Sequence, residues 1–194
     1  MFQRQKTGYR TQPLIIQEFI TEIEQRVLID WEEQVRPFLR HNRRGPERLY
    51  EQVQNLPIVP AEYNSIRRRL QAMLTLHDDD REPEFGWFLG SIGAGGFVHE
   101  HLDRSRFGRR HFRCNLFIQT PECGGEPIIE GIVQPFRERM LLCFFPDLQR
   151  HRSNVVAGLK RRIVCSFGYL IDINCDLNVA DRLDTKFFST LVGD

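Results

Sequence analysis

A series of short aromatic and β-branched segments in the second half of the chain constrains the fold more than any other feature. FGWFLGSI, HFRCNLFIQ, PIIEGIVQPF, RMLLCFF and RRIVCSFGYLI follow one another, separated by glycine, proline and charged residues. Segments of this composition and length are typical of strands, and no helical pattern interrupts them. The series therefore predicts an antiparallel sandwich or jelly-roll barrel over residues 84–175.

Residues 1–83 carry another pattern, which predicts a helical support region. Thr21 and Glu24 form a T-x-x-E capping box, and apolar residues recur at four-residue spacing from Ile23 to Val35. This arrangement predicts an amphipathic helix that begins after Thr21.

Two further helices are expected before the strands begin. A short one should follow the Gly45-Pro46 break, with Leu49 and Val53 on one side, and another should span residues 61–74. The charged run HDDDREP marks the boundary with the strands, and residues 176–194 are expected to form a closing segment packed through two phenylalanines, Phe187 and Phe188.

Composition limits the class of protein. A chain of 194 residues with 41% apolar residues is long enough for one domain with a core. Because 27 basic and 26 acidic residues nearly cancel, nucleic acid is an unlikely partner. No segment approaches a membrane span or a signal peptide, and five cysteines without a CxxC pair argue against a disulfide framework. We expect a protein of the reducing cytoplasm, of unknown oligomeric state.

One histidine and one aspartate follow a glycine-rich run, GAGGFVHEHLD. In a strand, residues two apart point to the same face, so His101 and Asp103 are expected to aim at one point inside the barrel. His151, after a predicted strand that ends in a Pro-Asp turn, is the candidate for a third ligand from a distant strand. Two histidines and a carboxylate form the facial triad that binds iron(II) in non-haem oxygenases.

Other histidines and acidic residues are alternative candidates for metal ligands. His99 shares the parity of His101 and is a candidate neighbour or substitute ligand, and Glu126 and Glu130 are weaker candidates. The sequence H-x-D also occurs at 77–79, but there it lies in a charged linker near a helix end, where we interpret it as a solvated charge run.

Basic residues follow the third ligand at a suitable distance to bind an anion. Lys160, Arg161 and Arg162 are candidates for the distal carboxylate of 2-oxoglutarate, whose 2-oxo acid end chelates the metal. Strand alternation places Arg161 on one face and the other two residues on the opposite face. On another predicted strand, Arg113 and Asn115 share a face, which lines either the barrel or a solvated surface.

In order and spacing, these residues resemble the iron(II)- and 2-oxoglutarate-dependent oxygenases of the prolyl 4-hydroxylase-like type. The resemblance covers roughly residues 85–170 and rests on Phe97, His101, Asp103, Gly124-Gly125-Glu126, Phe144-Phe145-Pro146-Asp147, His151 and Arg161. The spacing from His151 favours Arg161 for the co-substrate; an alignment on R-I-V-C-S-F favours Arg162, and Gly158-Leu159-Lys160 fits a G-x-K pattern.

The resemblance implies a double-stranded β-helix with supporting helices on one sheet, and Fe(II), 2-oxoglutarate and O2 as cofactor and co-substrates. It also implies hydroxylation of a C–H bond with release of succinate and CO2. Asp103 stands where halogenating relatives have a small residue, which favours hydroxylation, although demethylation stays open. The substrate is a small molecule or a protein side chain, and the basic loop Arg104–Arg110, with Arg106 and Arg109, suggests that it is anionic.

Two classes of protein remain as alternatives. A jelly-roll module without catalysis would bind a small molecule or partner protein and would not respond to iron or 2-oxoglutarate. A cupin-like metal enzyme would use several histidines and a glutamate at another spacing, which this chain does not offer.

Overall fold

The computed structural model describes residues 12–104 and 108–172. The predicted closing segment at 176–194, with Phe187 and Phe188, lies outside the described residues, as does Cys175.

The N-terminal part alternates helices with short strands. In chain order it contains β1 (Leu14–Ile16), α1 (Glu22–Val35), the 3-10 helix η1 (Arg36–Phe38), β2 (Arg40–His41), β3 (Arg48–Gln52), η2 (Val53–Asn55), α2 (Ala61–Leu74) and η3 (Asp78–Asp80).

Within residues 81–104 and 108–172, the regular elements that follow are all strands. They are β4 (Trp87–Ile92), β5 (Arg109–Gln119), β6 (Cys123–Gly124), β7 (Pro127–Ile129), β8 (Ile132–Val133), β9 (Leu141–Phe144), β10 (His151–Ser153), β11 (Val156–Ala157) and β12 (Arg162–Asp172). Each of the five segments predicted to form strands does so.

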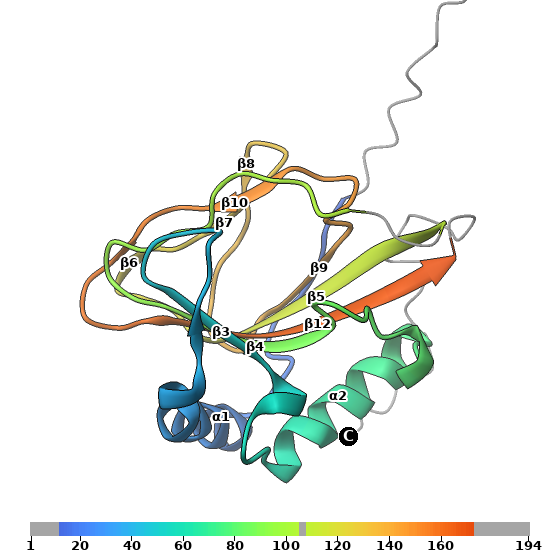
Figure 1. Cartoon of the computed structure of the whole chain (residues 1–194), viewed down its shortest axis with the longest axis horizontal. Coiled ribbons are helices and arrows are strands. Elements are labelled where there is room, and N and C mark those ends of the chain that lie inside the picture. Colours follow the sequence, from blue (N-terminus) through green and yellow to red (C-terminus); the bar gives the residue numbers. More distant parts are fainter. Residues whose placement is uncertain (1–11, 105–107, 173–194) are drawn as a thin grey trace, which may run out of the picture.

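The strands form two main sheets that face each other, one large and one small, and a separate two-stranded sheet (Figure 1). The large sheet has the order β1-β9-β5-β12-β4-β3-β2, and every pair within it is antiparallel. The small sheet has the order β10-β7-β8, and β11 pairs with β6 beside it. This confirms the predicted mainly β fold of two antiparallel sheets.

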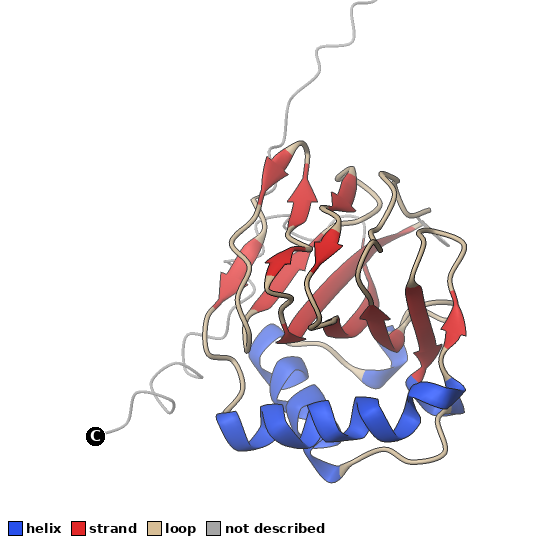
Figure 2. Ribbon diagram, turned by 90° about the vertical axis from the view of Figure 1, so that its left-hand side faces the viewer, coloured by secondary structure: helices blue, strands red, loops and turns tan. Residues whose placement is uncertain are grey.

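Both long helices cover the outer face of the large sheet (Figure 2). Tyr63 of α2 stacks on Phe167 of β12 with ring centroids 5.4 Å apart, and the Trp31 ring of α1 lies 5.3 Å from Tyr63. All three side chains belong to the main buried cluster. The helices therefore support the sheet from the side opposite the small sheet.

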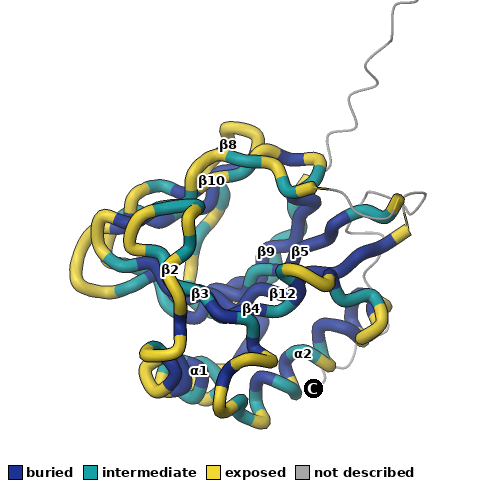
Figure 3. The backbone as a smooth tube through the Cα atoms, viewed as in Figure 1, coloured by how far each residue is buried: buried dark blue, intermediate teal, exposed yellow. Residues whose placement is uncertain are grey.

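Strand β12 separates this core from the barrel interior. Phe167 and its neighbours of the same parity, Cys165 and Tyr169, belong to the helix-facing cluster, whereas Val164 belongs to a second cluster on the other face. Most of the strand is buried, as is β5 beside it (Figure 3). The alternation of the strand thus decides which side chains can reach the interior.

The structure confirms the first and third predicted helices and corrects the second. Thr21 caps α1, and both bonds of the capping box with Glu24 are present. Ile23, expected on the inner face of this helix, is 68% exposed, and Leu28 is buried instead. The short helix expected after Gly45-Pro46 is wrong, because β3 forms there and pairs with β4.

In the part of the chain that the structure describes, neither α1 nor α2 has the length and apolar composition needed to cross a bilayer.

Candidate metal centre

Backbone pairing brings the three predicted ligands together. The N–H of His101 donates to the carbonyl of His151 at 3.1 Å, and the reciprocal bond measures 3.0 Å. Two residues on, the Asp103 N–H donates to the Pro146 carbonyl at 2.8 Å. The strand expected at 101–103 is in fact an extended segment with a single bridge pair, which fixes the two histidines side by side.

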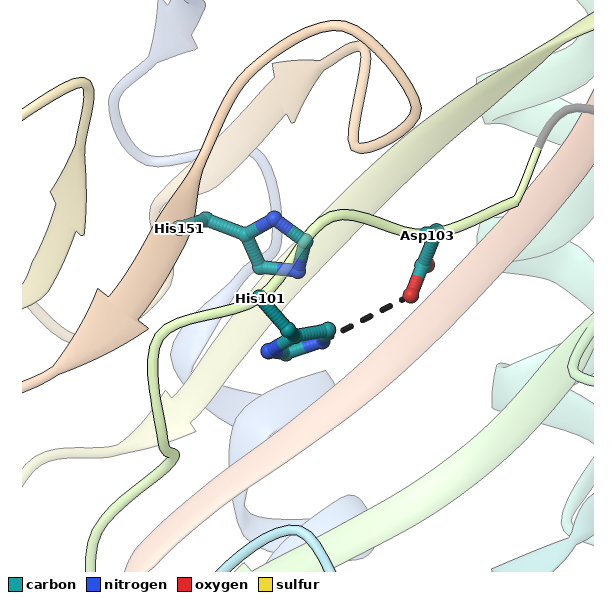
Figure 4. Close-up of side chains that lie close together, drawn as sticks. All are labelled: His101, Asp103 and His151. Atoms are coloured by element: carbon teal, nitrogen blue, oxygen red, sulfur yellow. Dashed lines mark ion pairs between the residues drawn. The ribbon is translucent and has the colours of Figure 1, made fainter.

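The three side chains converge on one point (Figure 4). One ligand atom from each of His101, Asp103 and His151 lies within 4.8 Å of the others. The two imidazole rings are 4.1 Å apart between centroids, and His101 Nε2 lies 3.5 Å from Asp103 Oδ1. Within residues 12–104 and 108–172, this is the one group of three such residues that could hold a metal ion.

Each histidine is oriented by the backbone two residues before it. Nδ1 of His101 lies 2.7 Å from the His99 carbonyl, and Nδ1 of His151 lies 3.0 Å from the Gln149 carbonyl. A carbonyl only accepts, so each neutral ring carries its proton on Nδ1 and presents a lone pair at Nε2. This is the tautomer and orientation that metal-binding histidines require.

Asp103 is surrounded by basic side chains. Arg44 Nη1 donates to its Oδ1 at 2.7 Å, and His111 Nδ1 and Arg113 Nη2 lie 3.3 and 3.6 Å from its Oδ2. Burial alone would raise the pKa of Asp103, but its contact with the His101 ring and the charge of Arg113 hold this pKa well below its usual range. The side chain is therefore a carboxylate throughout the neutral and mildly acidic range.

His151 is kept neutral by its surroundings. Burial is the largest cause, and the neighbouring His101 adds to it, so that the pKa of His151 is lowered to about 3. A neutral imidazole beside a permanent carboxylate is a ligand set that does not need to lose protons before it binds a cation.

The predicted partners from β5 line the pocket between the sheets. Arg113 Nη1 donates to Ser166 Oγ at 2.8 Å, and this hydroxyl donates to Asn115 Oδ1 at 2.8 Å. Both predicted residues line the same pocket as the three ligands. The polar face of β5 thus points into the barrel rather than to solvent.

The structure places the side chains of Arg161 and Arg162 on opposite sides of β12. The Arg161 side chain leaves the barrel and forms a 3.1 Å ion pair with Glu32 of α1. Arg162 shares the parity of Val164 and lines the pocket, where its guanidinium lies over two aromatic rings. The physical reason is the register of β12, which directs even-numbered side chains inward.

Several other candidates are occupied elsewhere. The His99 ring packs edge-on against Phe97 and is exposed, so only its backbone takes part in the site. Glu126 accepts from the Asn154 side chain at 2.9 Å, Glu130 accepts from the Arg150 N–H, and Lys160 is exposed. Glu126 and Glu130 therefore bind neighbouring segments of the chain through these hydrogen bonds.

The described arginines of the basic loop, Arg104, Arg109 and Arg110, do not line the pocket that holds the three ligands. Arg109 pairs with Asp80 at 2.5 Å and Arg110 with Asp147 at 3.4 Å. Arg104 lines a separate hollow beside Asp103. Arg106, named with Arg109 as a candidate substrate contact, lies outside the described residues.

Arginines from the N-terminal region reach the site, and the sequence did not indicate them. Arg44 covers Asp103 and lies 5.3 Å from the centre of the Phe85 ring, and Arg48 of β3 lines the pocket. Arg48 lies in the segment that was expected to form the short helix after Gly45-Pro46. The pocket contains five arginines and one carboxylate among its described lining residues: Arg44, Arg48, Arg113, Arg152, Arg162 and Asp103.

The fold is similar to that of several solved structures. No protein-family model matches the chain, and no curated protein matches it in sequence. Among solved structures, a Pseudomonas putida prolyl-4-hydroxylase superposes with a TM-score of 0.61 at 16% identity, covering 82% of this chain and 92% of that one. A Trichoplax adhaerens prolyl hydroxylase in complex with a hypoxia inducible factor peptide gives 0.59 at 13% identity, covering 95% and 89%.

HygX from Streptomyces hygroscopicus, with nickel, 2-oxoglutarate and hygromycin B bound, gives a TM-score of 0.56 at 11% identity and 83% coverage of each chain. At these identities the likeness is one of fold. It confirms the predicted double-stranded β-helix and the structural side of the resemblance to prolyl 4-hydroxylase-like proteins.

Proposed function

We propose that the protein is an Fe(II)- and 2-oxoglutarate-dependent dioxygenase. The observation that carries the proposal is the convergence of His101, Asp103 and His151 with both imidazole Nε2 atoms directed away from backbone partners. A pocket rich in arginine adjoins these residues, on a fold shared with proteins whose structures contain 2-oxoglutarate.

The three side chains would hold the metal on one face and leave the opposite positions to exogenous ligands. When bound, iron(II) and 2-oxoglutarate supply the oxidation of a C–H bond, with succinate and CO2 as co-products. The chain orients the two imidazoles through carbonyls and keeps Asp103 ionised through its cationic neighbours. Arg113 is held in turn by Ser166, so the support of the site is itself fixed.

Arg162 is the residue that we assign to the distal carboxylate of 2-oxoglutarate. Its Nε and Nη1 atoms are buried without a hydrogen-bond partner, and burial lowers its pKa to about 9. A carboxylate satisfies both defects, because it supplies charge and paired acceptors to the guanidinium fork. Asn115 and Arg113 lie in the same pocket and are assigned to the co-substrate or the substrate.

The favoured reaction is hydroxylation of a small molecule or a protein side chain. The structural relatives include proteins crystallised with a peptide and with hygromycin B. The carboxylate at Asp103 occupies the third ligand position, which supports hydroxylation over halogenation.

Uncoupled turnover tests the proposal without a known substrate. The protein would be incubated with iron(II), 2-oxoglutarate, ascorbate and air, and succinate measured over time. We expect succinate from the wild type and a loss of at least about tenfold in His101→Ala, since metal ligands and their supports contribute factors of this size or more. His99→Ala is the matched control, because that ring is exposed and its backbone carbonyl is retained.

Equal succinate formation by wild type and His101→Ala would contradict the proposal. If in addition neither protein bound metal, the fold would be better explained as a non-catalytic module that binds a small molecule or partner protein.

A further inference from the structure

Two arginines from distant parts of the chain lie in one row across the large sheet. Arg162 of β12 pairs with Ile92 of β4, and Arg48 of β3 pairs with the same residue from the other side. Directly paired residues point to the same face of a sheet, so both arginines flank Ile92 on the pocket side. All three line the pocket.

Ion pairs among the described residues do not balance the charges of these two arginines. Within residues 12–104 and 108–172 no carboxylate forms an ion pair with Arg48 or Arg162, although most nearby arginines have one. Arg48 Nη1, Arg162 Nε and Arg162 Nη1 are buried and have no hydrogen-bond partner. Buried polar atoms normally have a hydrogen-bond partner, so these exceptions at a pocket need an explanation. A bound anion would supply the missing acceptors.

The charge of Arg48 also acts on Arg162. The largest cause that lowers the pKa of each group is burial, and for Arg162 the next cause is the charge of Arg48. Like charges gathered in a buried pocket are unfavourable until an anion lies between them. Strands are spaced about 4.8 Å apart, so the two backbones lie roughly 10 Å apart and a single anion above Ile92 is within reach of both forks.

We propose that Arg48 and Arg162 together hold the distal carboxylate of 2-oxoglutarate, which makes Arg48 a determinant of co-substrate specificity. A carboxylate has two oxygens with about four lone pairs, enough for one guanidinium at each oxygen. The inference rests on the proposed function and extends the co-substrate site to a strand of the N-terminal region. It requires the pocket to select strongly for a 2-oxo acid with a charged distal end.

Binding to the manganese(II)-loaded protein, measured by calorimetry, tests this proposal without turnover. The two ligands are 2-oxoglutarate and 2-oxopentanoate, which has the same carbon chain but no distal carboxylate. The variants are Arg48→Met, Arg162→Met and the double variant. Arg161→Met is the matched control, because that arginine leaves the barrel to pair with Glu32.

Loss of one charge-assisted partner should weaken 2-oxoglutarate binding by about 10- to 100-fold in each single variant. Binding of 2-oxopentanoate should change little, so the preference for 2-oxoglutarate should fall by the same factor. A purely structural role of Arg48 would weaken both ligands alike and leave the preference intact. Because both arginines bind one group, the double variant should lose less than the product of the two single losses.

An unchanged preference in Arg48→Met, with the preference lost in Arg162→Met, would overturn this inference and leave the proposed function standing. Failure of the manganese-loaded wild type to bind 2-oxoglutarate would instead refute the proposed function, and the role of Arg48 with it.

Discussion

Replacing Arg162 by methionine should stabilise the free protein while it weakens the response to 2-oxoglutarate. Arg162 is 6% exposed, and burial lowers the pKa of its guanidinium from 12.5 to about 9. Both values lie above 7, so at neutral pH the group is charged in the folded and unfolded chain and the penalty is fully present. At 1.36 kcal/mol per pKa unit, the charged form is disfavoured in the fold by about 5 kcal/mol.

Part of this gain is offset by lost stacking. The Arg162 guanidinium lies 5.2 and 5.6 Å from the ring centres of Phe117 and Phe136, contacts that contribute about 0.5–1 kcal/mol each. Methionine has a similar length and no polar atom that needs a partner. We expect the free energy of unfolding to rise by about 1–3 kcal/mol, or about 2–4 °C in Tm for each kcal/mol.

The adjacent arginine provides the opposite expectation. Arg161 pairs with Glu32, whose side chain is fully buried, so Arg161→Met should destabilise the protein by about 1–3 kcal/mol. It should leave 2-oxoglutarate binding intact. Urea unfolding of both variants gives the stabilities, and thermal melting with manganese(II) and 2-oxoglutarate gives the response. If Arg162→Met is destabilised and its Tm responds to 2-oxoglutarate as much as the wild-type Tm does, the assignment of Arg162 to the distal carboxylate is refuted.

Three further predictions concern the ligands and the platform beneath them. The pKa of His151 is about 3 in the folded protein and 6.5 in the unfolded chain, so the free energy of unfolding should fall by about 2–3 kcal/mol as the pH drops from 7 to 4.5. In urea titrations, His151→Asn should lack this pH-dependent loss. The same pH dependence in wild type and variant would contradict the expectation. Asp103→Asn removes the carboxylate that faces the buried Arg113 and should lower the free energy of unfolding by about 3–5 kcal/mol. A loss below about 1 kcal/mol would contradict this expectation. Phe167→Ala should lower stability by about 3–5 kcal/mol in denaturant titrations and leave manganese affinity of the folded protein unchanged, whereas a weakened affinity would show that the helix platform shapes the site.

Local patterns predicted what depends on local structure. The capping box at Thr21 and the apolar segments at β4, β5, β9 and β12 appear where they were expected, because caps and strand composition are short-range properties. The spacing of His101 and Asp103 likewise indicated two side chains with a common direction, although the segment is held by one bridge pair rather than a regular strand.

Pairing between distant strands determined the features that the sequence left open or predicted wrongly. Leu49 and Val53 have helical spacing, yet Arg48–Gln52 pairs with the edge of β4, and a free strand edge is invisible in the local sequence. The choice between Arg161 and Arg162 depended on the inward parity of β12. In β12, Ser166 and Gly168 alternate with large apolar residues. This alternation indicated which residues point into the barrel, since the large apolar side chains pack against the helices.

Thermal melting with metal and co-substrate tests the central claim most directly. Wild type and His101→Ala would be melted with manganese(II) alone, with 2-oxoglutarate alone and with both. A ligand at about 100 times its Kd stabilises a fold by about 2.7 kcal/mol. We predict that manganese(II) raises the wild-type Tm, that 2-oxoglutarate raises it further only when the metal is present, and that His101→Ala shows neither shift. A wild-type Tm unmoved by both ligands, or equal shifts in His101→Ala, would contradict the metal centre.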